Sequence, residues 1–190
     1  MIQRLSRRLS ALARGWIVVA TVVIFVLFSI LVLPRVAAQS AARTGGAKQP
    51  DTSFIYSPAD LYQMAEAFGP AGRQAYILVR LTFDVVFPIV YGIVLIAVIS
   101  WLAGKAFAPG SPWRLLNLAP VAGMAFDYLE NTATVIVMAR YPLRTPVIDL
   151  LTPVFTFVKW VFVGGSFVVL LALIVLASWR WIGRRPQALK

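Results

Sequence analysis

The stretch from Trp16 to Leu33, WIVVATVVIFVLFSILVL, decides the fold class of this chain, because its 18 residues carry no charge. A helix that crosses about 30 Å of hydrocarbon needs about 20 mostly apolar residues. Three later stretches have a similar length and are mostly apolar, so the sequence predicts four crossings. The expected membrane-spanning segments are about 16–34, 75–102, 118–139 and 150–179.

The composition of the whole chain agrees with this interpretation. Of its 190 residues, 60% are hydrophobic and only 13% are charged, whereas a water-soluble domain has about 45–50% apolar and about 25% charged residues. These values exclude a soluble enzyme and a disordered chain. We therefore expect an all-α polytopic membrane protein, a four-transmembrane-helix bundle that forms a single membrane domain over residues 1–190.

The first apolar stretch has one feature of a signal peptide, because a basic segment precedes it. Its 18 residues exceed the apolar core of about 7–15 residues that is typical of signal peptides. Cleavage would also leave an odd number of crossings. We expect a retained anchor helix.

A long connection, about 35–74, joins the first two expected segments. Its first part, from Ala37 to Ser53, is rich in small and polar residues and predicts a flexible linker. Ser57 then offers a helix N-cap, and apolar residues recur at helical spacing until Gly69. The sequence predicts a short amphipathic helix at about 58–68, which lies on the membrane or covers the bundle.

The basic residues predict the orientation in the membrane. Ten of them fall on one side of the four expected segments and six on the other, so the positive-inside rule places both termini in the cytoplasm and the 35–74 loop outside. The ten are Arg4, Arg7, Arg8, Arg14, Lys105, Arg114, Arg180, Arg184, Arg185 and Lys190, and the six are Arg35, Arg43, Lys48, Arg73, Arg140 and Arg144.

The net charge of +11 is explained by these loop residues near anionic lipid head groups, so membrane lipids are the expected partners and nucleic acid is not. The chain contains no cysteine and no histidine. Disulfides, thiol nucleophiles, imidazole bases and the usual zinc, haem or copper ligands are therefore excluded. We expect neither a metal nor a cofactor.

Ionisable side chains within the expected segments are the most informative feature, because charge inside a membrane is costly. At 100° per residue, the second, third and fourth segments each carry one polar stripe. Asp84, Glu130 and Lys159 all fall about 15 Å from the outer boundary. We therefore expect one buried site in the outer half of the bundle. The candidate ligand-binding residues are Tyr76, Arg80, Asp84, Tyr91, Asp127, Glu130, Asn131 and Lys159.

The charges at this expected site do not balance. Three carboxylates against two basic side chains leave one surplus negative charge. We expect that one carboxyl, Asp127 or Glu130, keeps its proton or binds a cation. In the last segment, Gly164 and Gly165 are expected to permit close helix packing.

Three functions are compatible with this pattern. In the first, the site binds or moves a small polar ligand, a lipid head group or a cation. In the second, the charges form a purely structural network in an accessory subunit of a membrane complex. In the third, a carboxylate pair acts as acid and base on a lipid-like substrate, so enzyme activity is left open. A homo-oligomer or a larger complex is also left open.

Three motifs occur together: FGPAGRQAY at 68–76, DVVFPIVYG at 84–92 and DYLEN at 127–131. Their combination resembles an uncharacterised group of small bacterial four-helix integral membrane proteins, over roughly residues 56–165. The resemblance implies the same topology, in a bacterial cytoplasmic (inner) membrane, and no activity. It draws attention to the motif positions Tyr76, Asp84, Pro88, Tyr91, Asp127, Glu130 and Asn131.

Overall fold

The computed structural model describes residues 1–184, and the side chains of residues 1–179. Within the described part the chain is all-helical and contains no strand. Arg185 and Lys190, which contribute to the predicted orientation, lie outside the described residues. The elements are α1 (Ile2–Leu12), α2 (Gly15–Leu31), α3 (Leu33–Arg43), the short 3₁₀ helix η1 (Pro50–Thr52), α4 (Pro58–Leu81), α5 (Phe83–Ala106), the 3₁₀ helix η2 (Pro112–Leu118), α6 (Ala119–Arg140) and α7 (Ile148–Arg184).

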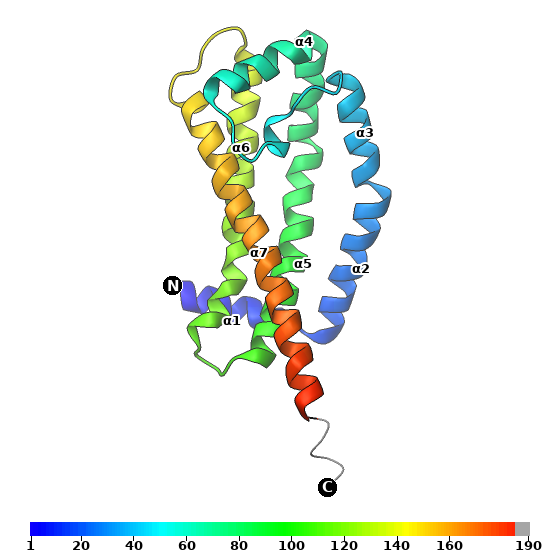
Figure 1. Cartoon of the computed structure of the whole chain (residues 1–190), viewed down its shortest axis with the longest axis vertical. Coiled ribbons are helices and arrows are strands. Elements are labelled where there is room, and N and C mark those ends of the chain that lie inside the picture. Colours follow the sequence, from blue (N-terminus) through cyan, green and yellow to red (C-terminus); the bar gives the residue numbers. More distant parts are fainter. Residues whose placement is uncertain (185–190) are drawn as a thin grey trace.

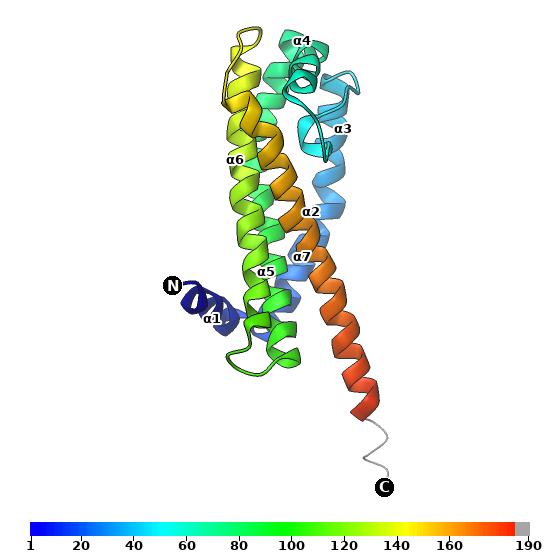
Figure 2. The same cartoon turned by 60° about the vertical axis from the view of Figure 1, so that its left-hand side comes forward.

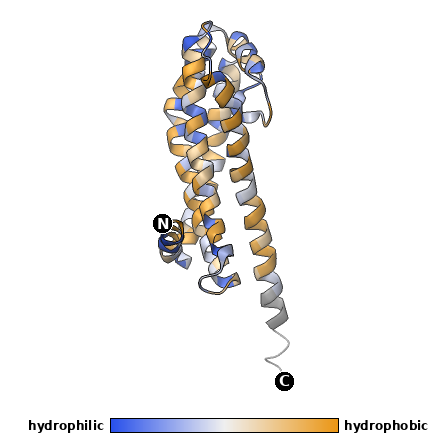
Figure 3. Cartoon of the chain, turned by 90° about the vertical axis from the view of Figure 1, so that its left-hand side faces the viewer, coloured by the Kyte–Doolittle hydropathy of each residue, from blue (hydrophilic) through white to orange (hydrophobic). Residues whose placement is uncertain are grey.

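The long helices α2, α5, α6 and α7 run along the long axis of the molecule (Figures 1 and 2), whereas α1 runs across one end. Three stretches are long and apolar enough to cross a membrane: Gly15–Arg43, Phe83–Ala106 and Ile148–Trp179. Apolar residues follow the length of these helices, and polar residues gather toward the ends (Figure 3). Side chains such as Ile24 and Leu171 are 59% and 63% exposed. This much exposed apolar surface indicates membrane association.

Helix α6 has 22 residues, which is long enough to cross a membrane, but it is not among these three stretches. Its mean hydropathy is lowered by Asp127, Glu130 and Asn131. All three side chains are buried inside the bundle. The expected fourth crossing therefore stays a prediction.

The connection between the first two expected segments differs from the flexible linker predicted from Ala37 to Ser53. Helix α3 continues to Arg43, so the prediction is wrong for the first part of that stretch. The remainder is tied to the bundle: the Gln49 side chain donates to the hydroxyls of Ser40 and Thr44, at 3.1 and 3.3 Å. Small polar residues are typical of a flexible linker, but here the hydroxyls of Ser40 and Thr44 accept the hydrogen bonds that hold the loop.

The predicted amphipathic segment forms the first part of α4. Ser57 caps it: its hydroxyl accepts from the Asp60 amide, and its own amide donates to the Asp60 carboxylate at 2.7 Å, which lowers the pKa of Asp60. The helix is interrupted at Gly69, whose φ of 62° is a conformation that favours glycine. Leu61, Met64 and Phe68 are buried in an apolar cluster with Tyr76 of the second part of α4 and Val137 of α6. Whether the segment also lies on a membrane surface stays a prediction.

The close helix contacts occur at other glycines than those predicted. A Cβ added to Gly164 or Gly165 would meet no atom within 4 Å, so these residues do not permit a close approach. A Cβ on Gly123 of α6 would instead lie 2.8 Å from Val163 Cγ2 on α7. Spacing along one helix cannot reveal which face meets a neighbour, and the prediction for Gly164 and Gly165 is wrong for that reason.

Candidate functional site

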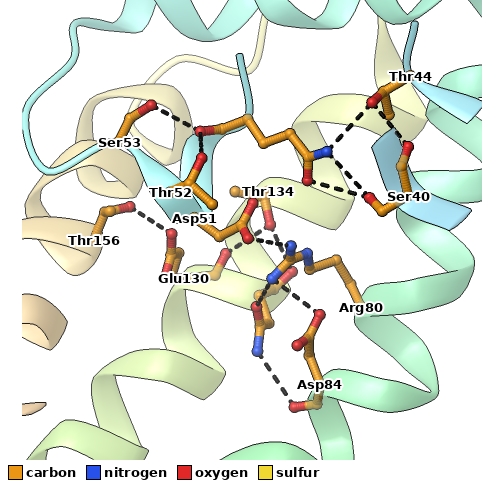
Figure 4. Close-up of polar contacts among 12 residues, drawn as sticks. Ser40, Thr44, Asp51, Thr52, Ser53, Arg80, Asp84, Glu130, Thr134 and Thr156 are labelled. Atoms are coloured by element: carbon orange, nitrogen blue, oxygen red, sulfur yellow. Dashed lines mark hydrogen bonds and ion pairs between the residues drawn. The ribbon is translucent and has the colours of Figure 1, made fainter. Parts of the chain in front are cut away.

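Arg80 is the centre of the site and has two counterions. It lies in the last turn of α4, and its guanidinium forms an ion pair of 3.0 Å with Asp84 in the first turn of α5. A second ion pair, of 2.8 Å, joins Arg80 to Asp51 of η1. Figure 4 shows Arg80 between the two carboxylates. The Arg80 side chain is only 6% exposed, so both partners offset the cost of its burial.

Asn131 of α6 links this charged group to the next helix. Its side-chain oxygen accepts a hydrogen bond from Arg80 at 3.2 Å. Its amide donates to the Asp127 carboxylate at 3.1 Å and to the Asp84 backbone carbonyl at 3.4 Å. One side chain therefore joins the ends of α4 and α5 to the middle of α6.

Asp127 differs from the other carboxylates in its partners. The Tyr91 hydroxyl donates to it at 2.8 Å, and Asn131 supplies the other hydrogen bond. Among the described residues no lysine or arginine forms an ion pair with Asp127. Its charge is met only by neutral donors.

Glu130, three residues after Asp127 on α6, has a basic partner. It forms an ion pair with Lys159 of α7, and the Thr156 hydroxyl donates to its other oxygen at 2.8 Å. The Tyr56 hydroxyl lies 2.8 Å from that of Thr156. Burial raises the pKa of Tyr56, which stands in the loop before α4. The loop thus reaches the ion pair between α6 and α7.

The structure brings the sequence-predicted residues together. All eight are buried. Seven of them form two groups that are held together by ion pairs or hydrogen bonds: Arg80, Asp84, Tyr91, Asp127 and Asn131 in one, and Glu130 and Lys159 in the other. The two groups adjoin because Glu130 and Asn131 are consecutive in the sequence. Tyr76, the eighth, lies with its ring centre 4.6 Å from the Arg80 guanidinium carbon. Their role in binding a ligand stays a prediction.

Sequence reasoning missed Asp51, which lies in the stretch expected to be a flexible linker. The Trp160 indole of α7 donates to the Asp51 carbonyl at 3.2 Å and so helps to hold η1 over the site. The only local signal is Pro50-Asp51, a pair typical of turns. With Asp51 included, four carboxylates face two basic side chains, Arg80 and Lys159, and the surplus rises from one negative charge to two.

Two cavities meet at the charged group. One, of about 400 Å³, is lined by charged side chains that include Asp84, Asp127 and Lys159, and by apolar residues of α3, α5 and α7. The second, of about 440 Å³, lies between α3, the η1 loop and the junction of α4 with α5. Asp51, Arg80 and Asp84 line both cavities.

Hydrogen-bonding capacity remains where the cavities meet. One carboxylate oxygen of Asp51 and the Nε of Arg80 are buried without a hydrogen-bond partner among the described residues. Buried polar atoms are almost always paired. These two atoms are therefore unpaired members of the charged group in this structure.

The described residues contain no group of three or more acidic side chains that could hold a metal ion. No protein-family model, curated protein or solved structure matches this chain, and the resemblance to small bacterial four-helix membrane proteins stays a prediction.

Proposed function

We propose that this chain is a four-span membrane protein that binds an amphiphile in its charged site, and that the head group of this amphiphile carries a positively charged amine. The observation that supports the proposal most strongly is the cavity of about 400 Å³, whose lining combines three carboxylates, two basic side chains and apolar residues of α3, α5 and α7. The proposed location is a bacterial inner membrane, with both termini in the cytoplasm.

The fourth crossing in this proposal is α6. It runs beside α5 and α7 along the long axis (Figure 2). The polar residues that lower its hydropathy are buried against those neighbours and would not meet lipid. Polar residues in membrane helices almost always face the bundle interior in this way.

The charge of the ligand follows from the charge of the site. Arg80 and Lys159 are each engaged in ion pairs, so neither is free to hold an anion without losing a partner. Asp127 lines the cavity and has no basic partner among the described residues. A buried carboxylate is costly unless it is paired, and an amine supplies both the charge and the hydrogen-bond donors.

The apolar part of the ligand follows from the apolar residues that line the cavity. They include Phe87 of α5 and Trp160, Val163 and Phe167 of α7. Phe167 is 40% exposed, so the cavity reaches the outer surface of the molecule. An alkyl chain that leaves the head group along these residues would pass from the acidic site toward the surrounding lipid.

A matched pair of probes tests both halves of the proposal. Dodecylamine and dodecanol have the same chain, and only the amine is charged at neutral pH. In native mass spectrometry of the detergent-purified protein, we expect one dodecylamine to bind at least tenfold more tightly than dodecanol. Asp127→Asn should abolish this preference, whereas Glu66→Gln, at an exposed acidic residue outside the site, should not.

Each other outcome contradicts part of the proposal. Equal binding of the two probes would mean that the site does not recognise an amine. Ethanolamine that binds as tightly as dodecylamine would identify a small polar ligand and exclude the amphiphile. Failure of all three probes to bind would favour the purely structural network.

A further inference from the structure

At the end of the molecule away from the charged site, α1 has three distinct faces. Arg4, Arg7 and Arg8 are exposed on one face. At 100° per residue, Ile2 and Leu5 fall on a second face, and these apolar side chains are 64% and 44% exposed. The third face contacts the bundle through Ser6, which is 3% exposed. Such a helix suits the boundary between water and hydrocarbon.

Hydrogen bonds hold α1 in its position across the end of the bundle (Figures 1 and 2). The Ser6 hydroxyl donates to the Arg114 carbonyl of η2 at 3.2 Å. The Asn117 amide donates to the Ser6 carbonyl at 3.1 Å and to the Ser100 hydroxyl of α5 at 2.9 Å. Because Asn117 is fully buried, α1 is attached to the bundle at a defined place.

A groove opens beside α1. Its volume is about 750 Å³, and every residue that lines it is apolar. The walls come from four elements, and they include Ile2 and Leu5 of α1, Trp113 and Leu116 of η2, Val121 of α6 and Phe162 of α7. A groove of this size and composition fits hydrocarbon chains.

The charge around the groove has one sign. No acidic residue occurs before Asp51, and none occurs between Asp84 and Asp127. All charged side chains of helix α1, of the end of α5 and of η2 are therefore basic. Arg4 and Arg8 are exposed on α1, and Arg8 follows the groove residue Leu5 by about one helical turn.

We propose that α1 and this groove form a binding site for an anionic phospholipid, separate from the charged site between α4 and α7. The acyl chains lie in the apolar groove, and the phosphate is bound by Arg4 and Arg8. A second copy of this chain does not suit the same surface, because two basic α1 helices repel each other.

Native mass spectrometry with two phospholipids of identical chains tests this site. We expect phosphatidylglycerol to bind more tightly than phosphatidylcholine, by about 30-fold if Arg4 and Arg8 each contribute as a basic residue near an anionic surface does. The double variant Arg4→Gln/Arg8→Gln should lose this preference. The matched control Arg35→Gln/Arg43→Gln, at exposed residues of α3, should keep it.

A second variant tests the groove itself. Ala122 lines the groove, and Ala122→Phe would fill part of it, so we expect weaker binding of both phospholipids. Equal affinity for the two lipids in the unmodified protein would overturn the proposal, as would an unchanged preference in the Arg4→Gln/Arg8→Gln variant. Dodecylamine binding is expected to be unaffected in these variants, which separates this proposal from that for the charged site.

Discussion

At the scale of single residues, Arg80 determines how the charged site responds to mutation. It keeps one counterion when the other is removed, because Asp51 and Asp84 both form ion pairs with it. We expect Asp51→Asn and Asp84→Asn each to lower the free energy of unfolding by less than the ~3–5 kcal/mol that follows loss of a sole partner. The double variant should lose more than the sum of the two, because only then is the buried guanidinium left without a carboxylate.

Unfolding of the four proteins in mixed detergent micelles measures this coupling. Glu66→Gln, at an exposed acidic residue, is the control for loss of a surface charge. Additive losses would mean that one of the two carboxylates does not stabilise Arg80 in the folded protein.

Glu130 and Asp127 are expected to respond in opposite ways. The sequence left either as the carboxyl with surplus charge, but Glu130 is paired with Lys159 and Asp127 has only neutral donors. Glu130→Gln should therefore lower the melting temperature strongly, since it leaves Lys159 buried without a counterion. Asp127→Asn should change it little, because the new amide oxygen can accept from Asn131 while its NH2 group donates to the Tyr91 hydroxyl.

The double variant Glu130→Gln/Lys159→Met provides the control for this pair. It removes both charges, and thermal unfolding should recover toward that of the unmodified protein. If the loss in the Glu130→Gln variant persists after Lys159 is replaced, the ion pair is not its cause.

At the scale of elements, the packing of α6 on α7 depends on Gly123. Alanine there would place a methyl group 2.8 Å from Val163 Cγ2, so the Val163 side chain or the helices must shift. We expect Gly123→Ala to cost about 1–3 kcal/mol, as overpacking does in other cores. Gly164→Ala is the matched control: it meets no atom within 4 Å and should be neutral or slightly stabilising, because alanine favours helix. Equal thermal stability of the two variants would contradict this account.

At the scale of the whole molecule, the orientation and the crossings expected before α7 can be measured together. The chain has no cysteine, so single cysteines at the exposed positions Gln3, Gln63, Ala108 and Leu143 report without background. With a membrane-impermeant maleimide on intact cells, we expect Gln63→Cys and Leu143→Cys to be labelled. Gln3→Cys and Ala108→Cys should react only after the membrane is opened.

Each label reports on a different part of the topology. Labelling of Ala108→Cys and Leu143→Cys from the same side would show that α6 does not cross. The reverse of the whole pattern would show that the orientation is wrong.

The sequence by itself determined the properties that depend on local pattern. Mostly apolar stretches predict helices that can cross a membrane. Charge in such helices is costly, so Arg80, Asp84, Asp127, Glu130 and Lys159 are identified as candidate site residues. Helical periodicity then places these side chains on one polar stripe of each helix. No tertiary contact is needed for these steps, because each follows from hydropathy and from 100° per residue.

Only the tertiary structure decided which charges pair. Asp51 reaches Arg80 from a loop far away in sequence, and Lys159 selects Glu130 and not Asp127, although both acids lie on one helix. Likewise, Gly123 meets a neighbour and Gly164 does not. Pairing and close packing depend on the rotation and register of one helix against another and on the path of the loops, and these are set by the packing of the whole bundle.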